Sequence, residues 1–100
     1  MLLAPNQFST ELNNTTSTGT LLGGSLTFSA SYWRVKNDGT LPVRFTLNST
    51  SPSTNDYEIR PGSLEEFQNV PPSSKFGLMT TSTSTSLADH RRVAVLALGG

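Results

Sequence analysis

The sequence predicts an all-β fold: a small antiparallel β-sandwich, immunoglobulin-like or jelly-roll-like, preceded by an extended N-terminal arm. Two observations lead to this prediction. Short runs of alternating apolar and polar residues recur from residue 25 onward, and turn residues separate them at intervals of about 8–12 residues, as in sandwiches and small barrels. No window shows the i, i+3, i+4 apolar spacing of an amphipathic helix. A chain of 100 residues also has the usual size of a single domain.

The composition favours strands and argues against several classes of function. The 14 serines and 14 threonines favour strands and loops, because hydroxyl side chains compete for backbone hydrogen bonds inside helices. The absence of cysteine excludes disulfides and thiolate chemistry, and it fits synthesis in a reducing cytoplasm. Seven basic residues are balanced by seven acidic ones, so we expect no nucleic-acid partner, since phosphate binding needs a cationic surplus. We also expect no signal peptide and no membrane partner.

Residues 1–24 are predicted to form the arm, and residues 25–100 the sandwich domain. Residues 13–20 are polar and aperiodic, and the apolar residues before them are too few to form a core. We expect the arm either to order against a partner surface, at a cost in conformational entropy, or to remain a mobile terminus. The candidate interface residues of the arm are Leu2, Leu3, Phe8 and Leu12.

A hairpin is predicted around the segment Asn37-Asp38-Gly39. A three-residue loop places Trp33 opposite Val43, and because directly opposed residues share a face, it collects the apolar side chains on one side. A two-residue loop would instead place Trp33 opposite Arg44 and mix the apolar and charged residues. The third residue of the preferred loop has a positive φ, which suits Gly39.

The outer face of this hairpin is predicted to be polar and basic. Tyr32 would lie opposite Arg44, close enough for a cation–π contact. The basic residues either contact an acidic partner surface or form the solvated side of an antiparallel sheet. The candidate interface residues outside the arm are Tyr32, Arg34, Lys36, Arg44, Arg91 and Arg92.

Two strands are predicted on either side of the pair Pro61-Gly62. Residues 56–60 form the first strand, with Tyr57 and Ile59 facing the core, and residues 64–67 form the returning strand. The pair itself has the composition of a type II turn, because proline fixes its own φ and glycine supplies a positive φ.

The last part of the chain is predicted to contribute two further strands. Residues 75–80 form one strand, with Phe76 and Leu78 on the same face. Residues 91–98 form the other, and the apolar run at 93–98 occupies both of its faces. This run is therefore either a central strand covered on both sides or a strand with one face at an interface.

No catalytic, cofactor-binding or metal site is predicted. The only histidine, His90, follows Asp89, and neighbouring side chains on a strand point to opposite faces, so the two cannot act as an acid–base pair. Asp56, Glu58 and the pair Glu65-Glu66 could approach a calcium ion, but no acidic loop has calcium-site spacing. We interpret these carboxylates as charges that protect sheet edges. We therefore predict that the protein is not an enzyme and uses no cofactor.

Five turn and core segments lie between residues 35 and 98. They are Val35-Lys36-Asn37-Asp38-Gly39, Pro42-Val43-Arg44-Phe45, Arg60-Pro61-Gly62, Val70-Pro71-Pro72 and Val93-Ala94-Val95-Leu96-Ala97-Leu98. On these segments the chain from Tyr32 onward resembles the small β-sandwich proteins of tailed-bacteriophage virions. Such proteins commonly decorate or cement capsids, often with an extended terminal arm that holds neighbouring subunits.

The resemblance implies a capsid decoration, or cement, protein that binds the major capsid protein on the virion surface after synthesis in the host cytoplasm. It also implies self-association, as a trimer or a dimer. It transfers no individual functional residue, because the segments specify a scaffold and not a site. Two alternatives stay open: another virion component of the neck, tail or fibre attachment, and a carbohydrate-binding module that uses Tyr32 or Tyr57.

Overall fold

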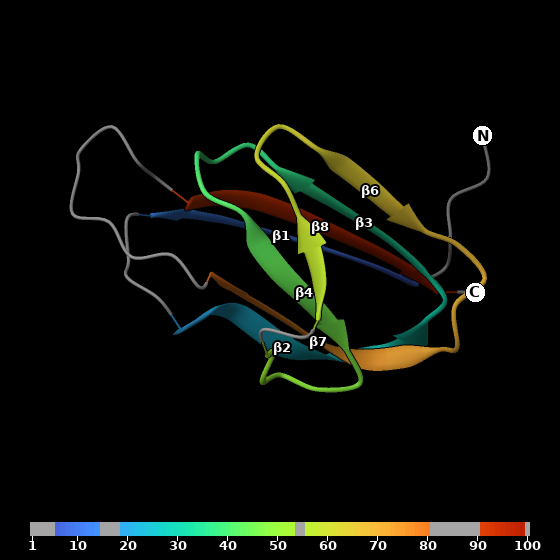
Figure 1. The fold of residues 1–100 in the computed structure, drawn as a ribbon. Helices are drawn as coiled ribbons and strands as arrows, with labels where there is room; N and C mark the ends of the chain where they lie inside the picture. The colour runs from blue at the N-terminus through green and yellow to red at the C-terminus, as the bar shows by residue number, and fades with distance from the viewer. Residues whose placement is uncertain (1–5, 15–18, 54–55, 81–90, 100) are drawn as a thin grey trace.

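The computed structural model describes residues 6–14, 19–53, 56–80 and 91–99 of the chain. The described residues form eight β-strands and no helix, so the all-β prediction is confirmed. The strands make two antiparallel four-stranded sheets that pack face to face as a sandwich (Figure 1). The hydrophobic core lies between the two sheets.

We name the two sheets after their long central strands. The β8 sheet has the order β1-β8-β3-β6 and consists of β1 (Asn6–Asn14), β8 (Arg91–Gly99), β3 (Tyr32–Asn37) and β6 (Leu64–Phe67). The β7 sheet has the order β2-β7-β4-β5 and consists of β2 (Gly19–Ala30), β7 (Ser73–Thr80), β4 (Val43–Leu47) and β5 (Tyr57–Ile59). The outer face of each sheet is the side turned away from the other sheet.

The pairing pattern is that of a jelly roll. β1 pairs with β8, β2 with β7, β3 with β6 and β4 with β5, so the chain folds as one long antiparallel hairpin of four strand pairs. Alternate pairs belong to alternate sheets, and two further pairings, β3 with β8 and β4 with β7, complete each sheet. An eight-stranded roll of two Greek keys has this order. Of the two sandwich types that the sequence leaves open, the structure has the jelly roll.

The hairpin predicted around residues 37–39 is wrong, because β3 lies in the β8 sheet and β4 lies in the β7 sheet. Trp33 is paired with Ala97 and Phe67 within its own sheet. It meets β4 only across the core, where its ring centroid lies 6.0 Å from that of Phe45. The alternation of apolar and polar residues determines which side chains face the core. It does not determine whether a segment pairs with the next strand in the same sheet or faces that strand across the core.

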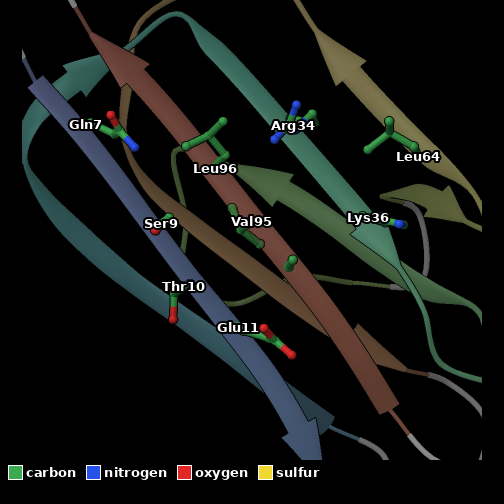
Figure 2. A pocket seen from close by; sticks show the side chains of 10 residues that line it. Gln7, Ser9, Thr10, Glu11, Arg34, Lys36, Leu64, Val95 and Leu96 are labelled. Carbon is green, nitrogen blue, oxygen red and sulfur yellow. The ribbon is translucent and has the colours of Figure 1, made fainter. Parts of the chain in front are cut away.

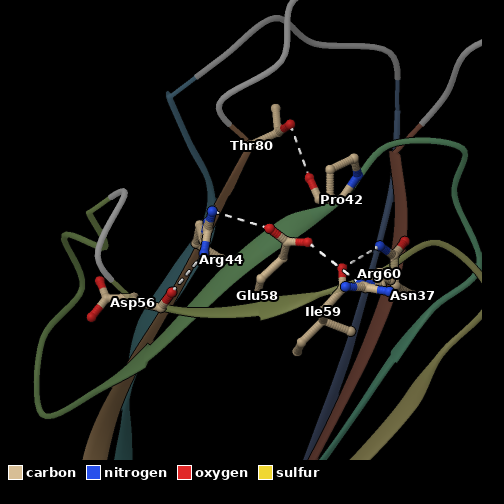
Figure 3. A network of polar contacts seen from close by, with 8 residues as sticks. All are labelled: Asn37, Pro42, Arg44, Asp56, Glu58, Ile59, Arg60 and Thr80. Atoms are coloured by element: carbon tan, nitrogen blue, oxygen red, sulfur yellow. Dashed lines mark hydrogen bonds and ion pairs between the residues drawn. The ribbon is translucent and has the colours of Figure 1, made fainter.

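Asn37 holds the chain at the point where it leaves the β8 sheet (Figure 3). Its buried side-chain amide donates to the carbonyl oxygens of Leu41, 2.9 Å away, and Ile59, 3.0 Å away. Its Oδ1 atom accepts the N–H of Gly39 at 3.0 Å, an Asx turn, and Gly39 is not among the described glycines with positive φ. Because a buried polar group is costly unless it is hydrogen-bonded, these contacts fix the crossing between the sheets.

The turn predicted at Pro61-Gly62 is confirmed. Gly62 has a φ of 81°, and the N–H of Ser63 donates to the carbonyl oxygen of Arg60 at 3.0 Å, as in a type II turn. The strand predicted at 64–67 is also present as β6. It pairs with β3 rather than with β5, so this turn is a second crossing between the sheets.

Aromatic rings form a continuous chain through the core. Neighbouring ring centroids lie 5.3 to 6.0 Å apart, in the order Phe8, Phe76, Trp33, Phe45, Phe67 and Tyr57. Trp33 is fully buried, and its indole N–H donates to the carbonyl oxygen of Ala30 at 3.1 Å. Ile59 is buried as predicted. Tyr57 lies on the inward side of its strand, as predicted, because it is paired with the buried Phe45 and its ring contacts Phe67. Its position at the sheet edge nevertheless leaves it 51% exposed.

The predicted boundary between an arm and a sandwich at residue 24 is corrected by the structure. Residues 6–14 form β1, which pairs with β8 along its whole length, and residues 19–24 belong to β2. Serine and threonine residues dilute the apolar alternation there, so the pattern resembles an irregular segment. Residues 1–5 and 15–18 lie outside the described residues.

Three other strand predictions are confirmed. Residues 25–30 alternate between exposed positions and half-buried or buried positions as the second half of β2. Residues 75–80 lie in β7, where Phe76 and Leu78 are buried together. Residues 91–98 lie in β8.

Candidate protein-binding face

The outer face of the β8 sheet carries a shallow groove of about 800 Å³ (Figure 2). Side chains of β8 form its floor, and side chains of β1, β3 and β6 border it. We call the outward-facing side chains of this sheet the β8 face. They are Gln7, Ser9 and Glu11 on β1; Arg92, Ala94, Leu96 and Leu98 on β8; Tyr32, Arg34 and Lys36 on β3; and Leu64 and Glu66 on β6.

The centre of the β8 face is apolar. Side chains on a strand alternate between its two faces, so every second residue of β8 is buried in the core and the residues between them point outward. The outward, half-buried residues of this central stripe are Ala94, Leu96 and Leu98. Leu64 on β6 is 50% exposed and is separated from this stripe by Lys36 of β3, with which it is paired. Apolar residues at the outward positions of a central strand are typical of an interaction site.

The two borders of this stripe differ in charge. On one side, Glu11 of β1 is paired with Ala94. On the other side, Lys36 of β3 is paired with the same Ala94, and Arg34 is paired with Leu96. The β1 border therefore contributes a carboxylate, and the β3 border contributes two cations.

Exposed ion pairs engage part of this charge within the chain. The Nε of Arg92 lies 3.5 Å from Oε1 of Glu11, and the Nζ of Lys36 lies 3.7 Å from Oδ1 of Asp38. Pairs as exposed as these contribute about 0–1 kcal/mol, so a partner surface can replace them at little cost. Within the described part of the chain, Arg34 takes part in no ion pair.

Tyr32 positions a carboxylate on the β8 face. Its hydroxyl donates to Oε2 of Glu66 at 3.0 Å, and the side-chain amide of Gln68 donates to the same oxygen at 3.4 Å. Burial raises the pKa of Tyr32, the hydrogen bond and the charge of Glu66 raise it further, and Arg34 acts in the opposite direction. The neutral phenol is therefore the form that the folded chain favours.

The structure brings together four of the predicted interface residues. Tyr32, Arg34 and Lys36 lie on β3, and Arg92 lies beside them on β8. All four belong to the β8 face. Arg91 is also in β8, where its backbone is paired with that of Asn14, but its side chain lies outside what the structure describes.

Two predicted interface residues of the arm are core residues instead. Phe8 packs on Phe76 with ring centroids 5.6 Å apart, and Leu12 is 7% exposed. Their prediction as interface residues is therefore wrong, because β1 turns both side chains toward the opposite sheet. Leu2 and Leu3 lie outside the described residues.

Arg44 lies on the opposite side of the sandwich, on the outer face of the β7 sheet. Its Nη2 lies 3.0 Å from Oε2 of Glu58, and its Nη1 donates to the carbonyl oxygen of Asp56 at 3.1 Å (Figure 3). The predicted cation–π contact with Tyr32 is therefore wrong, because the two residues occupy different sheets.

Sequence reasoning missed Glu11, Leu64 and Leu96 as candidate site residues. One signal was available, because the run at 93–98 is apolar at outward as well as inward positions. The structure makes β8 a central strand between β1 and β3, buried on its inner side only. That one face lies at an interface stays a prediction.

The carboxylates considered for calcium do not meet. Asp56 and Glu58 belong to the β7 sheet side, whereas Glu65 and Glu66 lie on β6 in the β8 sheet. Among the described residues, no three His, Cys, Asp or Glu side chains are grouped as a metal site requires. His90 and Asp89 lie outside the described residues. The described part of the chain also contains no helix long and apolar enough to span a membrane.

Comparisons of the chain with known protein families and with curated proteins gave no match. The function must therefore be inferred from the fold and from the β8 face.

Proposed function

We propose that this protein is a structural component of a virion: a capsid decoration, or cement, protein that binds major capsid protein subunits and further copies of itself on the shell surface. The observation that supports this most is the β8 face, an apolar stripe bordered by charged side chains on a two-layer scaffold. The proposal includes no catalytic step, cofactor or metal.

The β8 face has the composition of a protein-binding surface. Protein interfaces combine an apolar centre with a polar rim, and Tyr and Arg are enriched in them. Leu96 and Leu98 supply such a centre, and Tyr32 and Arg34 border it. Small-molecule pockets instead enclose most of their ligand and direct a few polar groups at it. The described residues enclose the groove only in part, so a broad partner surface fits it better than a small ligand does.

The jelly roll supports this role without assigning it, because capsid domains and lectins share the architecture and one fold hosts many functions. A cement protein acts by mass action. Binding to the assembled shell, and not to free subunits, stabilises the shell by about 2.7 kcal/mol per site when the free protein is about 100-fold above its Kd. This mechanism requires a stable scaffold and a binding surface but no reacting group.

The test is cosedimentation of the purified chain with assembled capsids of the virus that encodes it, with unassembled major capsid protein as the control. We expect saturable binding to the assembled shell, at a fixed number of copies per capsid, and capsid disruption at a higher temperature. An electron-microscopy map of the native particle should place the chain on the capsid surface. Absence of the chain from purified virions would rule the proposal out, and density at the neck, tail or fibre would favour the alternative placement.

A carbohydrate-binding module is the second candidate, because Tyr57 is 51% exposed at the seam where β5 and β6 lie at the sheet edges. A tyrosine ring offers an apolar face and a polar end to a sugar, and lectins are among the jelly rolls. Glycan-array binding that is lost in Tyr57→Ala would support this function. An array without any binding would exclude it for the glycans tested.

A further inference from the structure

We propose that the β8 face packs against the β8 face of a second copy of this chain in a two-fold symmetric dimer, with Leu96 at its centre and Glu11 of each copy facing Lys36 of the other. The inference extends the proposed function and rests on the self-association included there. It names the surface and the symmetry through which that association occurs.

The register of the β8 sheet arranges the β8 face in three rows. One row contains Glu11, Ala94 and Lys36; the middle row contains Ser9, Leu96 and Arg34; and the third contains Gln7, Leu98 and Tyr32. In these three rows the β8 residue is apolar, the β1 residue is acidic or neutral, and the β3 residue is a cation or a tyrosine. Arg92, the outward residue of β8 before Ala94, lies beyond these rows and is ion-paired with Glu11 of its own copy, 3.5 Å away. The face is therefore asymmetric across β8.

A two-fold axis parallel to β8 would bring the acidic side of one copy against the cationic side of the other. Such an axis places β8 over the second copy's β8 and β1 over the second copy's β3, and it keeps each row opposite itself. Leu96 then meets the same leucine of the second copy, and Glu11 meets Lys36. Both contacts occur twice, as an isologous interface requires. Two packed sheets are rotated by about 30°, so the middle row with Leu96 makes the closest contact.

The charge of the β8 face favours a second copy over a strongly charged partner. The cations Arg34, Lys36 and Arg92 are balanced by Glu11, Glu66 and the adjacent Asp38. A balanced face gives no electrostatic preference to an acidic or a basic surface, since complementarity requires opposite potentials on the two sides. Because it has opposite charges on the two sides of one apolar stripe, the β8 face is instead complementary to the β8 face of a second copy.

The size of the face predicts a dimer that depends on concentration. About this axis only β1, β8 and β3 overlap with strands of the second copy. Three strands about 4.8 Å apart and a nine-residue strand rising about 3.4 Å per residue give a projected area of roughly 14 by 30 Å. Stable interfaces of standard size bury about 800 Å² on each partner, so this contact is smaller than the standard and has the size of a weak, transient interface. We therefore expect reversible association of the purified chain.

The first experiment measures sedimentation velocity of the purified 100-residue chain over a range of concentrations. We expect a monomer–dimer equilibrium, weakened at least about tenfold by Leu96→Glu, because each dimer would bury two additional carboxylates. Met79→Glu is the matched control: Met79 also points outward from a central strand and is paired with an arginine, Arg44, as Leu96 is with Arg34. Circular dichroism checks that both variants fold.

The second experiment reverses the two charges. Glu11→Lys and Lys36→Glu should each weaken the dimer, and the double variant should restore it, because the pair is re-formed between the copies. Within one copy the two residues lie two strands apart, and each is ion-paired with another residue, Glu11 with Arg92 and Lys36 with Asp38. A rescue between copies should therefore appear in the dimer dissociation constant and not in the stability of the monomer.

Several results would overturn the inference: a wild-type monomer at every concentration, a trimer, equal dissociation by Leu96→Glu and Met79→Glu, or a double variant that is no better than the single ones. The experiments use the purified chain without capsids, so they separate this inference from the proposed function. A monomer that still binds capsids refutes only the dimer, and a dimer that is absent from virions refutes only the capsid role.

Discussion

The outer faces of the two sheets have similar central strands, but they differ in how much of each face the chain itself covers. In each sheet a long central strand is paired with an arginine-bearing neighbour: Leu96 of β8 with Arg34, and Met79 of β7 with Arg44. On the β7 sheet the chain covers part of its own surface, because the segment after β4 lies over Gly77. On the β8 sheet none of the described segments covers the groove, whose lining side chains Figure 2 shows.

Two glycines make the cover on the β7 sheet possible. A Cβ added at Gly77 would lie 2.8 Å from Cδ of Pro52, and one added at Gly23 would lie 3.2 Å from the carbonyl oxygen of Thr50. Gly23 and Gly77 are paired across β2 and β7, so the absence of two neighbouring side chains lets the loop approach the sheet closely. The β8 face has leucine and alanine in its centre, with no described segment over them. Packing within the described part of the chain thus covers part of the outer face of the β7 sheet and leaves the β8 face uncovered.

The largest effect on this comparison is expected at Asn37, because the two faces exist only if β3 and β4 lie in different sheets. Asn37→Ala removes the donors to the carbonyl oxygens of Leu41 and Ile59 and the acceptor for the N–H of Gly39. An unsatisfied buried group costs about 1–3 kcal/mol, so we expect the free energy of unfolding to fall by about 3 kcal/mol or more. Urea denaturation followed by tryptophan fluorescence measures it.

The control for this variant is Asp38→Ala, at the neighbouring exposed position. The side chain of Asp38 makes a long ion pair with Lys36, 3.7 Å, so its loss should change the free energy of unfolding by about 0.5 kcal/mol or less. The alanine variant keeps the backbone N–H of residue 38, which donates to the carbonyl oxygen of Arg92 at 2.7 Å. Equal losses in the two variants would contradict the assignment of Asn37 as the residue that fixes the crossing.

An intermediate effect is expected when a small outward residue of each central strand, Gly77 of β7 or Ala94 of β8, is replaced by valine. Gly77→Val forces the loop at Pro52 to move, and overpacking of this kind costs about 1–3 kcal/mol. Ala94→Val adds its methyl groups to the open groove of the β8 face, so it should change the free energy of unfolding of the monomer by about 0.5 kcal/mol or less. Thermal denaturation of both variants at low protein concentration makes the comparison. A loss at Ala94 as large as that at Gly77 would mean that the two faces are equally covered.

A smaller effect separates the two outward arginines. Arg44→Ala removes an ion pair with Glu58 and a hydrogen bond to the carbonyl oxygen of Asp56, and we expect a loss of about 1 kcal/mol. Arg34 takes part in no ion pair within the described residues, so Arg34→Ala should leave monomer stability within about 0.5 kcal/mol. Urea denaturation of both variants measures the difference. The reverse order would show that Arg34 stabilises the fold and is not held free for a partner.

The pattern of the sequence predicted which side chains face the core better than it predicted their neighbours. Trp33, Phe76 and Leu78 are buried as the two-residue period requires. The pairing of β3 was not predictable in the same way, because the residues around Asn37 fit a hairpin and a crossing between sheets equally well. Pairing with β8, which follows far later in the chain, distinguishes the two, and a local pattern contains no information about it.

The candidate site was predictable only in part for the same reason. The outward leucines of β8 were visible in the run at 93–98, and Arg34 and Lys36 were correctly placed on the outer side of their strand. The contribution of Glu11 was not visible, since it requires β1 to pair with β8 and the sequence around it resembles a loop. Arg44 was misplaced because the hairpin that put it beside Tyr32 does not form.

The smallest effect is expected at Tyr32, which tests whether the β8 face is preorganised by its own contacts. Burial, and then Glu66, raise the pKa of Tyr32 above its ordinary value of 10.0, so the folded state favours the neutral phenol. The resulting stabilisation is fully present below pH 10.0 and is lost as the pH rises through the raised pKa. Above pH 10.0, stability should therefore fall more steeply for the wild type than for Tyr32→Phe, which cannot ionise. Denaturation across this range, with ultraviolet titration of the phenols, measures the difference, and parallel curves would show that neither burial nor Glu66 favours the neutral phenol in the folded state.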